Sequence, residues 1–423
     1  MSLIVAFITV FLVVFSYLRN RDLLNPIVLT NGFWFIIIFL NIINLYKYRQ
    51  INSYIYLIII IGVISFSIGS SLPVLNIKHH KRVLLSSMEV DPIIQKIYFV
   101  IPFISLIALD VVAAGFLVSG YTIADIRYSL NNTIFSNDLI NIVFKFITYP
   151  MVVSYIIICF SKILVTQRFS ISIIVRPLIL TIMDFLVWGD RLLIYIWLIS
   201  GLVIYFTVKK NNNNRKTIRK TRKYVGFIVI ITFAFLILRG STFKTLLYTI
   251  YTYLSGGVVY FSQNINRINE SAGSTILFSS YQGLIRPFMA ILDGFNIHIK
   301  QFDIATEFLL DNNNISILLS NDSSDYFNYF TTAFAYFYYD FKIFGVILHS
   351  LLWGVLCKSA YYKFRNRLNE RNACIFIFYI ISIALSVMDY AFVEVSFSMG
   401  LLYCLFAYIF SKIIKKRGNF NEK

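Results

Sequence analysis

The sequence predicts an all-α, polytopic membrane protein with about 11 transmembrane helices. Apolar runs long enough to cross a bilayer as helices alternate with short polar breaks along the chain. Hydrophobic residues make up 58% of the 423 residues and charged residues only 14%, whereas a soluble protein carries about 25% charged residues. Helices are expected because lipid offers no water to satisfy backbone polar groups, and the runs lack the short alternating pattern of a membrane barrel.

The apolar runs define eleven expected spans, in order along the chain. They cover residues 2–18, 26–45, 54–75, 94–118, 139–164, 171–189, 191–208, 224–238, 343–363, 373–392 and 395–413. The first run has no basic segment before it and no small-residue cleavage site after it, so we expect a retained span rather than a signal peptide. The eighth run is the shortest and ends at Arg239. The four cysteines lie in or at the ends of runs and are interpreted as packing residues.

The distribution of Lys and Arg orients the chain in the membrane. Basic residues follow every odd-numbered span, at Arg19, 78–82, Arg168, 209–223, 365–371 and 415–417. Cytoplasmic loops carry such an excess of positive charge, so we expect an external N-terminus and a cytoplasmic C-terminus. This asymmetry accounts for the net charge of +18. The lipid bilayer is therefore the expected partner, and a nucleic acid is not.

Two long polar segments interrupt what we expect to be a single membrane-embedded domain over residues 1–423. Residues 209–223 are predicted to form a basic cytoplasmic loop that contacts anionic headgroups. Residues 239–342 form a large external loop between the eighth and ninth helices, and its length requires it to fold on the membrane surface. Within this loop, residues 246–254 suit an interfacial helix with tyrosine rings at headgroup level, broken by Gly256 and Gly257.

Charged side chains inside the spans are expensive and mark candidate functional sites. Asp110, Lys145, Asp184 and Asp389 all fall in the outer halves of their spans, and Arg191 opens the seventh span on the same side. An ion-coupled transporter needs polar groups along its whole path, so this one-sided distribution favours a polar cavity open to the outer leaflet. The alternative is structural pairing, for example of Asp110 or Asp184 with Lys145.

The outer region combines basic, acidic and aromatic residues without a recognised metal or nucleotide motif. There is no HExxH, CxxC or DxD-like cluster and no Walker loop, so we expect no metal and no cofactor. His298 and His349 are the histidines on the outer side. The aromatic run at 334–339 and residues 326–330 can stack on sugars or lipid, or form an interfacial belt.

Three short motifs give this pattern its resemblance to a known family. They are Asn25-Pro26 at the start of the second span, Gly189-Asp190-Arg191 on an outer hairpin, and residues 328–345. The chain resembles the Wzy-type O-antigen and capsule repeat-unit polymerases of bacteria. In residues 328–345 that family has Asn and Thr before Tyr-x-Asp-Phe-Gly and a further Gly, and here Lys342 stands where the first of those glycines is expected.

The resemblance implies a GT-C-like, metal-independent membrane glycosyltransferase in the bacterial inner membrane, with a periplasmic N-terminus and large loop. It would transfer an undecaprenyl-diphosphate-linked glycan onto another undecaprenyl-diphosphate-linked repeat unit, with a chain-length regulator as a further candidate partner. Cations stabilise the departing diphosphate, and an acid or histidine orients the acceptor hydroxyl.

The residues predicted for these roles form two sets. The catalytic set is Asp340, Arg286, Arg191 and His349. The substrate-binding set is Arg239, Arg267, Glu307, Tyr338, Tyr281 and Lys145, and Glu307 is also an alternative base. Asp340 has a structural alternative as well, because an acid near the start of the ninth span is favourable for the helix.

Two other functions compete with polymerisation. An O-antigen ligase shares the external loop and the lipid-diphosphate donor but transfers the glycan to the lipid A core, and His298 leaves this reading open. A flippase or transporter for lipid-linked oligosaccharides is expected to have inverted repeats and polar positions through both membrane halves, and the sequence shows neither.

We expect Arg286→Ala and Arg191→Ala to abolish polymer formation while the protein still inserts, because each removes a cation from the diphosphate site. Arg→Lys variants should also be impaired, since lysine cannot bind a phosphate with a bidentate fork. The measurement is the length distribution of the surface polysaccharide. Wild-type chain lengths from both alanine variants would remove these residues from the mechanism.

Overall fold

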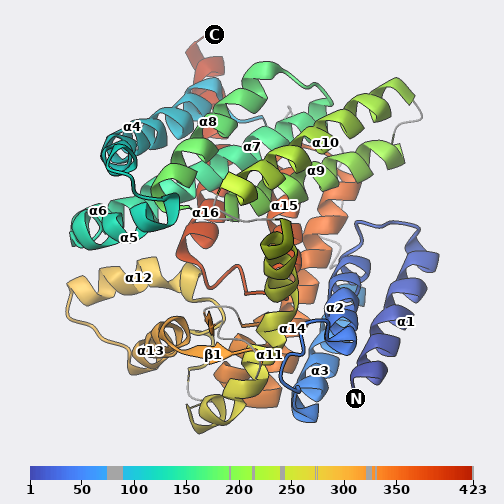
Figure 1. Ribbon diagram of the computed structural model, residues 1–423. Helices are drawn as coiled ribbons and strands as arrows, with labels where there is room; N and C mark the ends of the chain where they lie inside the picture. Colours follow the sequence, from blue (N-terminus) through green and yellow to red (C-terminus); the bar gives the residue numbers. More distant parts are fainter. Residues whose placement is uncertain are drawn as a thin grey trace. The chain divides into compact units, whose positions relative to one another are not determined.

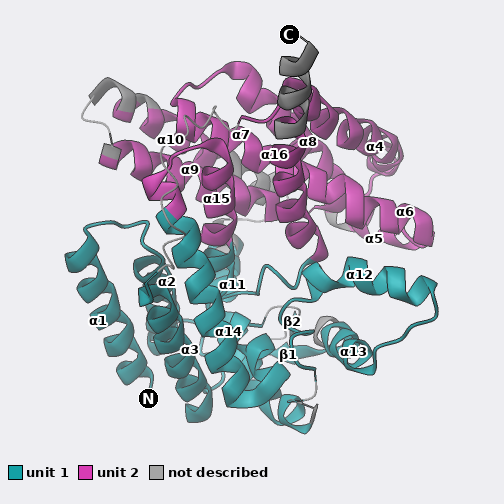
Figure 2. Cartoon of the chain, turned by 180° about the vertical axis from the view of Figure 1, so that it is seen from behind, with its two compact units in different colours: residues 1–77, 243–362, 382–394 teal, residues 78–242, 363–381, 395–423 magenta. Residues whose placement is uncertain are grey.

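The computed structural model describes residues 1–73, 89–189, 192–211, 215–238, 243–271, 273, 275–320, 326–328 and 331–421. The chain forms two compact units (Figure 2). Unit 1 comprises Met1–Ile77, Phe243–Tyr362 and Ser382–Glu394, and unit 2 comprises Lys78–Thr242, Lys363–Ile381 and Val395–Lys423. Each unit is assembled from separate segments of the chain, and the single membrane-embedded domain expected over residues 1–423 stays a prediction.

Nearly all of the regular structure is helical (Figure 1). The elements of unit 1 are α1 (Ser2–Asn20), α2 (Pro26–Ile43), α3 (Ser53–Ser71), α11 (Phe243–Ser271), α12 (Gln282–Gly294), α13 (Lys300–Asn314), β1 (Ser316–Leu318), β2 (Tyr326–Asn328) and most of α14 (Ala333–Asn366). The elements of unit 2 are α4 (Pro92–Val118), α5 (Ile123–Thr133), α6 (Asp138–Val143), η1 (Phe144–Thr148), α7 (Tyr149–Thr166), α8 (Ile171–Trp188), α9 (Leu192–Asn211), α10 (Arg215–Leu238), most of α15 (Glu370–Leu385), and α16 (Val395–Asn421).

Helices lie at each position where the sequence predicted a span. Among the described residues, eight are long and apolar enough to cross a membrane: α1, α2, α3, α4, the stretch from α6 to α7, α8, α9 and α14. These helices have the character of a polytopic membrane protein. The remaining three predicted spans overlap α10, α15 and α16, although α15 ends at Leu385, before the predicted end at residue 392. The count of eleven stays a prediction.

Side-chain caps fix several of the helix starts. Asn25 caps α2 by accepting a hydrogen bond from the Ile27 amide, and Pro26 occupies the first helical position, where its missing N–H costs nothing. Asp91 caps α4 in the same way, with Pro92 following. The Asn-Pro pair noted in the sequence is therefore a helix-initiation signal.

The two polar segments differ from the loops that the sequence predicted. Residues 209–223 are largely helical, because α9 continues to Asn211 and α10 begins at Arg215. The segment 239–342 contains α11, α12, α13 and a short antiparallel hairpin of β1 and β2. The expected interfacial helix at 246–254 is part of the 29-residue α11, which Gly256 and Gly257 do not break.

The tyrosines of α11 contact other parts of unit 1. The Tyr251 hydroxyl donates to the Leu40 carbonyl at 2.7 Å and accepts from the Leu45 amide at 3.0 Å. The Tyr48 hydroxyl pairs with Thr252 at 2.7 Å. These rings form a core cluster with Val259, Tyr260, Leu319 and Phe327. Burial against protein raises the pKa of Tyr48 above its usual value, so its hydroxyl stays neutral.

The most consequential feature of unit 1 is a break inside α14. Phe341 (φ −145°, ψ 31°) and Lys342 (φ 53°, ψ −139°) leave the helical conformation. The positive φ at Lys342 is one that glycine adopts easily and other residues only under strain. After the break the chain folds back so closely that a side chain at Gly345 would overlap the carbonyl oxygen of Phe337.

The section of α14 before this break is a core helix. Each residue from 333 to 340 is buried. The Phe334 ring stacks on Trp34 of α2 with centroids 4.7 Å apart. After the break, the Gly354 carbonyl accepts a hydrogen bond from Ser70 of α3 at 3.0 Å. The helix after the break begins at residue 343, where the sequence expected the ninth span to begin, and the preceding helix from Ala333 was not predicted.

Unit 2 is built around α7. Most of the apolar stretch from α6 to α7 is buried in the protein. Ser154 of α7 donates to the carbonyl of Gly400 in α16 at 2.8 Å, and Phe160 makes an edge-on contact with Trp197 of α9. A hydroxyl-to-carbonyl bond between packed helices suits an apolar environment, where small polar side chains join spans.

We expect Gly345→Ala to destabilise the protein, because the new methyl group would overlap the Phe337 carbonyl and overpacking costs about 1–3 kcal/mol. Gly32→Ala in α2 is the matched control, since nothing lies within 4 Å of its added methyl group and alanine favours a helix. Thermal unfolding in detergent should show a lower midpoint for Gly345→Ala alone. An unchanged or higher midpoint for Gly345→Ala would contradict the close approach.

Candidate functional site

Asp340 is the last residue before the break in α14, and its carboxylate is fully buried. Its Oδ1 accepts hydrogen bonds from Thr275 Oγ1 at 2.7 Å and from the Ser279 amide at 3.1 Å. Its Oδ2 accepts from the Ser280 amide at 3.1 Å and from the Ser280 hydroxyl. Each oxygen thus receives two hydrogen bonds, which satisfies the lone pairs of an ionised carboxylate.

The donors come from a tight turn at residues 275–281 that precedes α12. The Phe278 amide bonds to the Thr275 carbonyl, and the Tyr281 amide to the Leu277 carbonyl. Since the single hydroxyl proton of Thr275 goes to Asp340, the 3.0 Å contact between Thr275 and Ser279 has the Ser279 hydroxyl as donor. The turn presents consecutive amides to one acceptor, as anion-binding backbone segments do.

His349 lies on the other side of Asp340. Its Nε2 is 3.4 Å from Asp340 Oδ2, and both side chains have no exposed surface. Nine residues of straight helix would separate two positions by about 13 Å along the axis. The break at Phe341 and Lys342 is what brings these two residues of α14 together.

Aromatic rings enclose the imidazole. Its centroid is 5.4 Å from the Phe337 ring and 5.7 Å from the Tyr281 ring. Tyr390 packs edge-on against Phe337, Tyr281 and Trp353. Tyr281 is partly exposed, and burial raises its pKa to about 12, so its hydroxyl is neutral at physiological pH. The dyad of Asp340 and His349 thus has a neutral phenol beside it, and the oxygen of that phenol is buried.

A third segment, residues 386–394, closes the arrangement. The Gly283 amide bonds to the Phe392 carbonyl at 3.1 Å, and the Ala333 amide to the Ser386 carbonyl at 2.8 Å. The site is therefore built from three stretches of unit 1 that are distant in sequence, around residues 275–283, 333–349 and 386–394. Backbone hydrogen bonds between the stretches hold them in register.

Three predicted site residues meet here, namely Asp340, His349 and Tyr281. Tyr338, predicted to bind substrate, lies in the core instead. Its hydroxyl donates to Asn269 Oδ1 at 2.5 Å and pairs with the Tyr54 hydroxyl at 3.1 Å. The neighbouring run 334–339 is buried, so it forms neither an open sugar-stacking surface nor an interfacial belt. Asp340 also does not cap the ninth span, since its hydrogen bonds go to the turn.

The other predicted residues lie elsewhere. Arg286 is exposed on α12, five residues after Tyr281. Arg267 of α11 has Nη1 3.8 Å from Asp311 Oδ2. Lys145 is exposed on η1 in unit 2. Arg191 and Arg239 lie outside the described residues.

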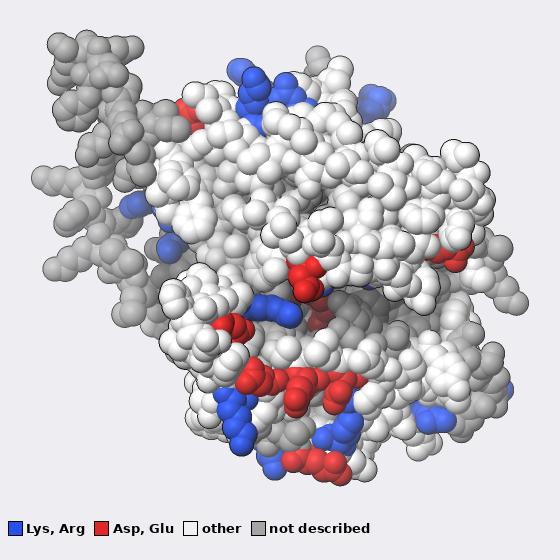
Figure 3. All heavy atoms as spheres, turned by 90° about the vertical axis from the view of Figure 1, so that its left-hand side faces the viewer, with Lys and Arg blue, Asp and Glu red and all other residues white. Residues whose placement is uncertain are grey.

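Glu307 belongs to an acidic row on α13. Asp303, Glu307 and Asp311 are four residues apart and exposed, so they share one helix face. Figure 3 shows acidic side chains gathered in such a row. His298, the histidine of the ligase reading, is also exposed and lies 3.3 Å from Asp293. Glu307 and His298 therefore face solvent, unlike the buried dyad.

The residues that complete the site were not identified from the sequence. Thr275, Ser279 and Ser280 supply all four hydrogen bonds to Asp340, and Tyr390 packs beside His349's aromatic neighbours. A polar pair, Ser279-Ser280, directly before an aromatic residue was the one signal available. Among the described residues, no group of three or more His, Cys, Asp or Glu side chains is placed to hold a metal ion.

We expect Asp340→Ala to lower the free energy of unfolding by about 3 kcal/mol or more, because it leaves two amides and two hydroxyls without their acceptor. The matched control is Asp303→Ala, an exposed acid of α13, which should change stability by less than about 0.5 kcal/mol. Denaturant titration in mixed micelles provides the measurement. Equal stability of the two variants would show that the carboxylate does not hold the turn.

Compared with known proteins, the chain matches no family model, no curated protein and no solved structure. The resemblance to Wzy-type polymerases therefore depends on the three short motifs. Of these, residues 328–345 contain the buried Asp340 and the positive φ at Lys342, where the family has glycine.

Proposed function

We propose that the chain is a metal-independent membrane glycosyltransferase that polymerises O-antigen or a related surface polysaccharide. It would act at the periplasmic face of the bacterial inner membrane, on undecaprenyl-diphosphate-linked donor and acceptor glycans. The observation that carries the proposal is the pairing of Asp340, the acid of the resembling motif, with His349. An acid that orients a histidine is a common arrangement for activating a hydroxyl group.

In this proposal Asp340 is the positioning residue and His349 is the base. The hydrogen bonds from the turn hold the carboxylate in place, and its charge, 3.4 Å from Nε2, favours the neutral imidazole tautomer that carries its proton on Nε2. That tautomer leaves Nδ1 as an acceptor. Both ring nitrogens of His349 are buried, and neither has a hydrogen-bond partner among the described residues. A buried polar atom without a partner is costly, and an acceptor hydroxyl group would satisfy it.

The reaction balances with these groups. The acceptor hydroxyl oxygen attacks the anomeric carbon of the donor and forms the new glycosidic bond, while its proton passes to His349. The bond from the anomeric carbon to the diphosphate oxygen breaks, and undecaprenyl diphosphate departs with the electron pair. The lost proton later leaves His349 for solvent.

The departing diphosphate needs cations. Among the described residues, Arg286 is the candidate for binding the departing diphosphate, because it is exposed on α12 and follows Tyr281 by five residues. Its guanidinium can bind phosphate oxygens with a bidentate fork. Arg191 and Arg239 are proposed from the sequence for the same role, and Arg267 is proposed to hold the second diphosphate.

We expect His349→Phe to abolish polymer while leaving the fold intact. The phenyl ring is larger than the imidazole it replaces between Phe337 and Tyr281, and overpacking of this kind costs about 1–3 kcal/mol, less than the stability of a typical domain. The readout is lipopolysaccharide from a producing strain that carries only the variant. Phe410→Leu, an exposed apolar position of α16, is the control and should keep wild-type chain lengths.

The form of lipopolysaccharide that a deletion strain makes distinguishes a polymerase from a ligase. Loss of a polymerase leaves lipopolysaccharide with a single repeat unit, whereas loss of a ligase leaves bare core. A His349→Phe variant that is folded and makes wild-type chains would contradict the role of His349. Bare core lipopolysaccharide in the deletion strain would indicate that the protein is a ligase and not a polymerase.

A further inference from the structure

Helix α12 leaves a row of large apolar side chains uncovered. Phe288 and Ile291 of α12, with Phe295 directly after it, are 62, 61 and 72% exposed. Their spacing of three and four residues places them on one helix face, and we call them the apolar row. The buried residues of α12 are Gln282, Gly283 and Met289. An exposed apolar cluster of this kind marks a contact with a partner or a membrane.

The neighbouring helix α13 has the opposite pattern. Its Phe302 and Phe308 are buried, and the Phe308 ring stacks on Tyr339 with centroids 3.6 Å apart. Its acids, among them Asp303 and Glu307, are exposed. This helix therefore buries its apolar face in protein and turns its charges to water, whereas α12 turns apolar side chains outward.

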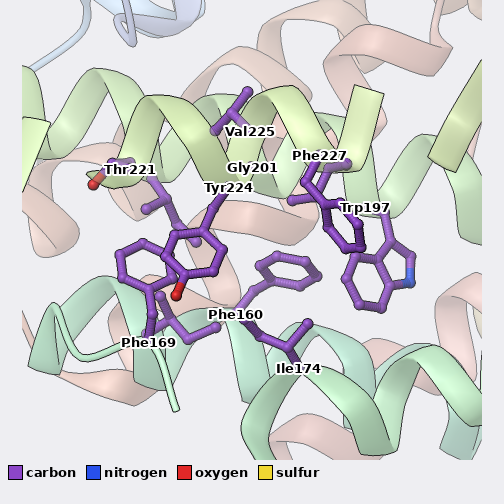
Figure 4. Close-up of a pocket in the computed structure, with 12 residues that line it drawn as sticks. Phe160, Phe169, Ile174, Trp197, Gly201, Thr221, Tyr224, Val225 and Phe227 are labelled. Atoms are coloured by element: carbon purple, nitrogen blue, oxygen red, sulfur yellow. The ribbon is translucent and has the colours of Figure 1, made fainter. Parts of the chain in front are cut away.

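Unit 2 also covers its aromatic side chains with protein. Phe160, Trp197 and Tyr224 lie around one small space lined by α7, α9 and α10 (Figure 4). Phe160 contacts the Trp197 ring edge-on, with centroids 4.9 Å apart. Rings of this chain are thus covered where helices pack, but the apolar row of α12 stays more than half exposed.

Hydrogen bonds fix the start of α12 near the ends of two predicted spans. The turn before α12 bonds to Asp340, and the helix after the break, which is the predicted ninth span, begins at residue 343. The Gly283 amide bonds to the Phe392 carbonyl at 3.1 Å, shortly before the predicted eleventh span begins at residue 395. In the orientation that the basic residues predict, both spans begin at the outer face. The start of α12 is therefore expected at the outer membrane interface.

The depth and length of α12 suit a helix that lies within this interface. The Tyr281 ring is 5.7 Å from the ring of His349, a residue about 9 Å along the helix axis from residue 343. Interfacial helices bury their apolar face by about 5–10 Å. With 13 residues, α12 is about 20 Å long, less than the ~30 Å of a bilayer core. Figures 1 and 2 show it extending away from α14.

The surface of α14 shows that lipid is expected at the same level. Phe344, Leu348 and Leu352 are exposed and follow one face of the helix after the break. Apolar side chains exposed on a span favour contact with lipid. Arg286 and Asp293 lie on the face of α12 opposite the apolar row, since successive residues are 100° apart around the helix axis. An interfacial helix needs such a polar face toward water.

We propose that α12 is an interfacial helix whose apolar row inserts among the acyl chains of the outer leaflet. Bilayer lipid is the occupant that matches the level of α12, its polar face and the neighbouring apolar surface of α14. The sequence predicted an interfacial helix at residues 246–254, which the structure instead includes in α11. The inference does not depend on the proposed glycosyl transfer.

Photocrosslinking of the full chain tests this contact. Phe288→p-benzoylphenylalanine, introduced through an amber codon, is placed in nanodiscs of phosphatidylethanolamine and phosphatidylglycerol and irradiated. We expect intact-protein mass spectrometry to show the added mass of one phospholipid, because the probe reacts with the C–H bonds that it touches. The matched control has the probe at Asp293, which is exposed on the opposite face of the same helix, and should give about tenfold less lipid adduct or less.

Further positions extend the test to the whole row and to α13. The probe at Ile291 or Phe295 should form the lipid adduct, and the probe at Asp303 of α13 should not. Equal lipid adduct at positions 288 and 293, or none at position 288, would overturn the proposal. A crosslinked dimer would identify a second copy of the chain as the occupant, and a crosslink from position 288 to residues 89–238 would identify unit 2. Either result would also overturn it.

Discussion

The break in α14 is the constraint on which the organisation of unit 1 depends. A continuous helix would separate Asp340 from His349 by about 13 Å, yet their side chains lie 3.4 Å apart. The backbone reaches this geometry through a positive φ at Lys342, a conformation that costs about 1–3 kcal/mol for a residue with a side chain. The hydrogen bonds that Asp340 makes immediately before the break offset that cost.

Asp340 also ties together segments that are distant in sequence. Its carboxylate fixes the turn at residues 275–281, and that turn leads into α12, where Gly283 bonds to the third segment through Phe392. A buried carboxylate with all its acceptors satisfied is a strong local constraint. The same geometry places the buried nitrogens of His349 beside the ring of Tyr281. The structural and catalytic interpretations of Asp340 are therefore compatible.

The helices were largely predictable and the site was predictable only in part. Apolar runs locate the spans because membrane helices are selected for uniform hydrophobicity, and Asn25-Pro26 marked a helix start. The run at 334–339 was misplaced because aromatic residues that are typical of an interface are equally suited to a protein core. Asp340 and His349 were identified by residue type, but their pairing depends on the helix break at Phe341 and Lys342. The donors Thr275, Ser279 and Ser280 could not be predicted, since tertiary packing alone brings them to Asp340.

The central claim is that Asp340 and His349 are in contact, and a double-mutant cycle tests it most directly. The free energy of unfolding is measured for the wild type, Asp340→Asn, His349→Phe and the combined variant. Contacting residues in one polar network show coupling energies of about 0.5–3 kcal/mol, and we expect a value in that range. Additivity within about 0.3–0.5 kcal/mol, as seen for residues far apart, would contradict the folded-back α14.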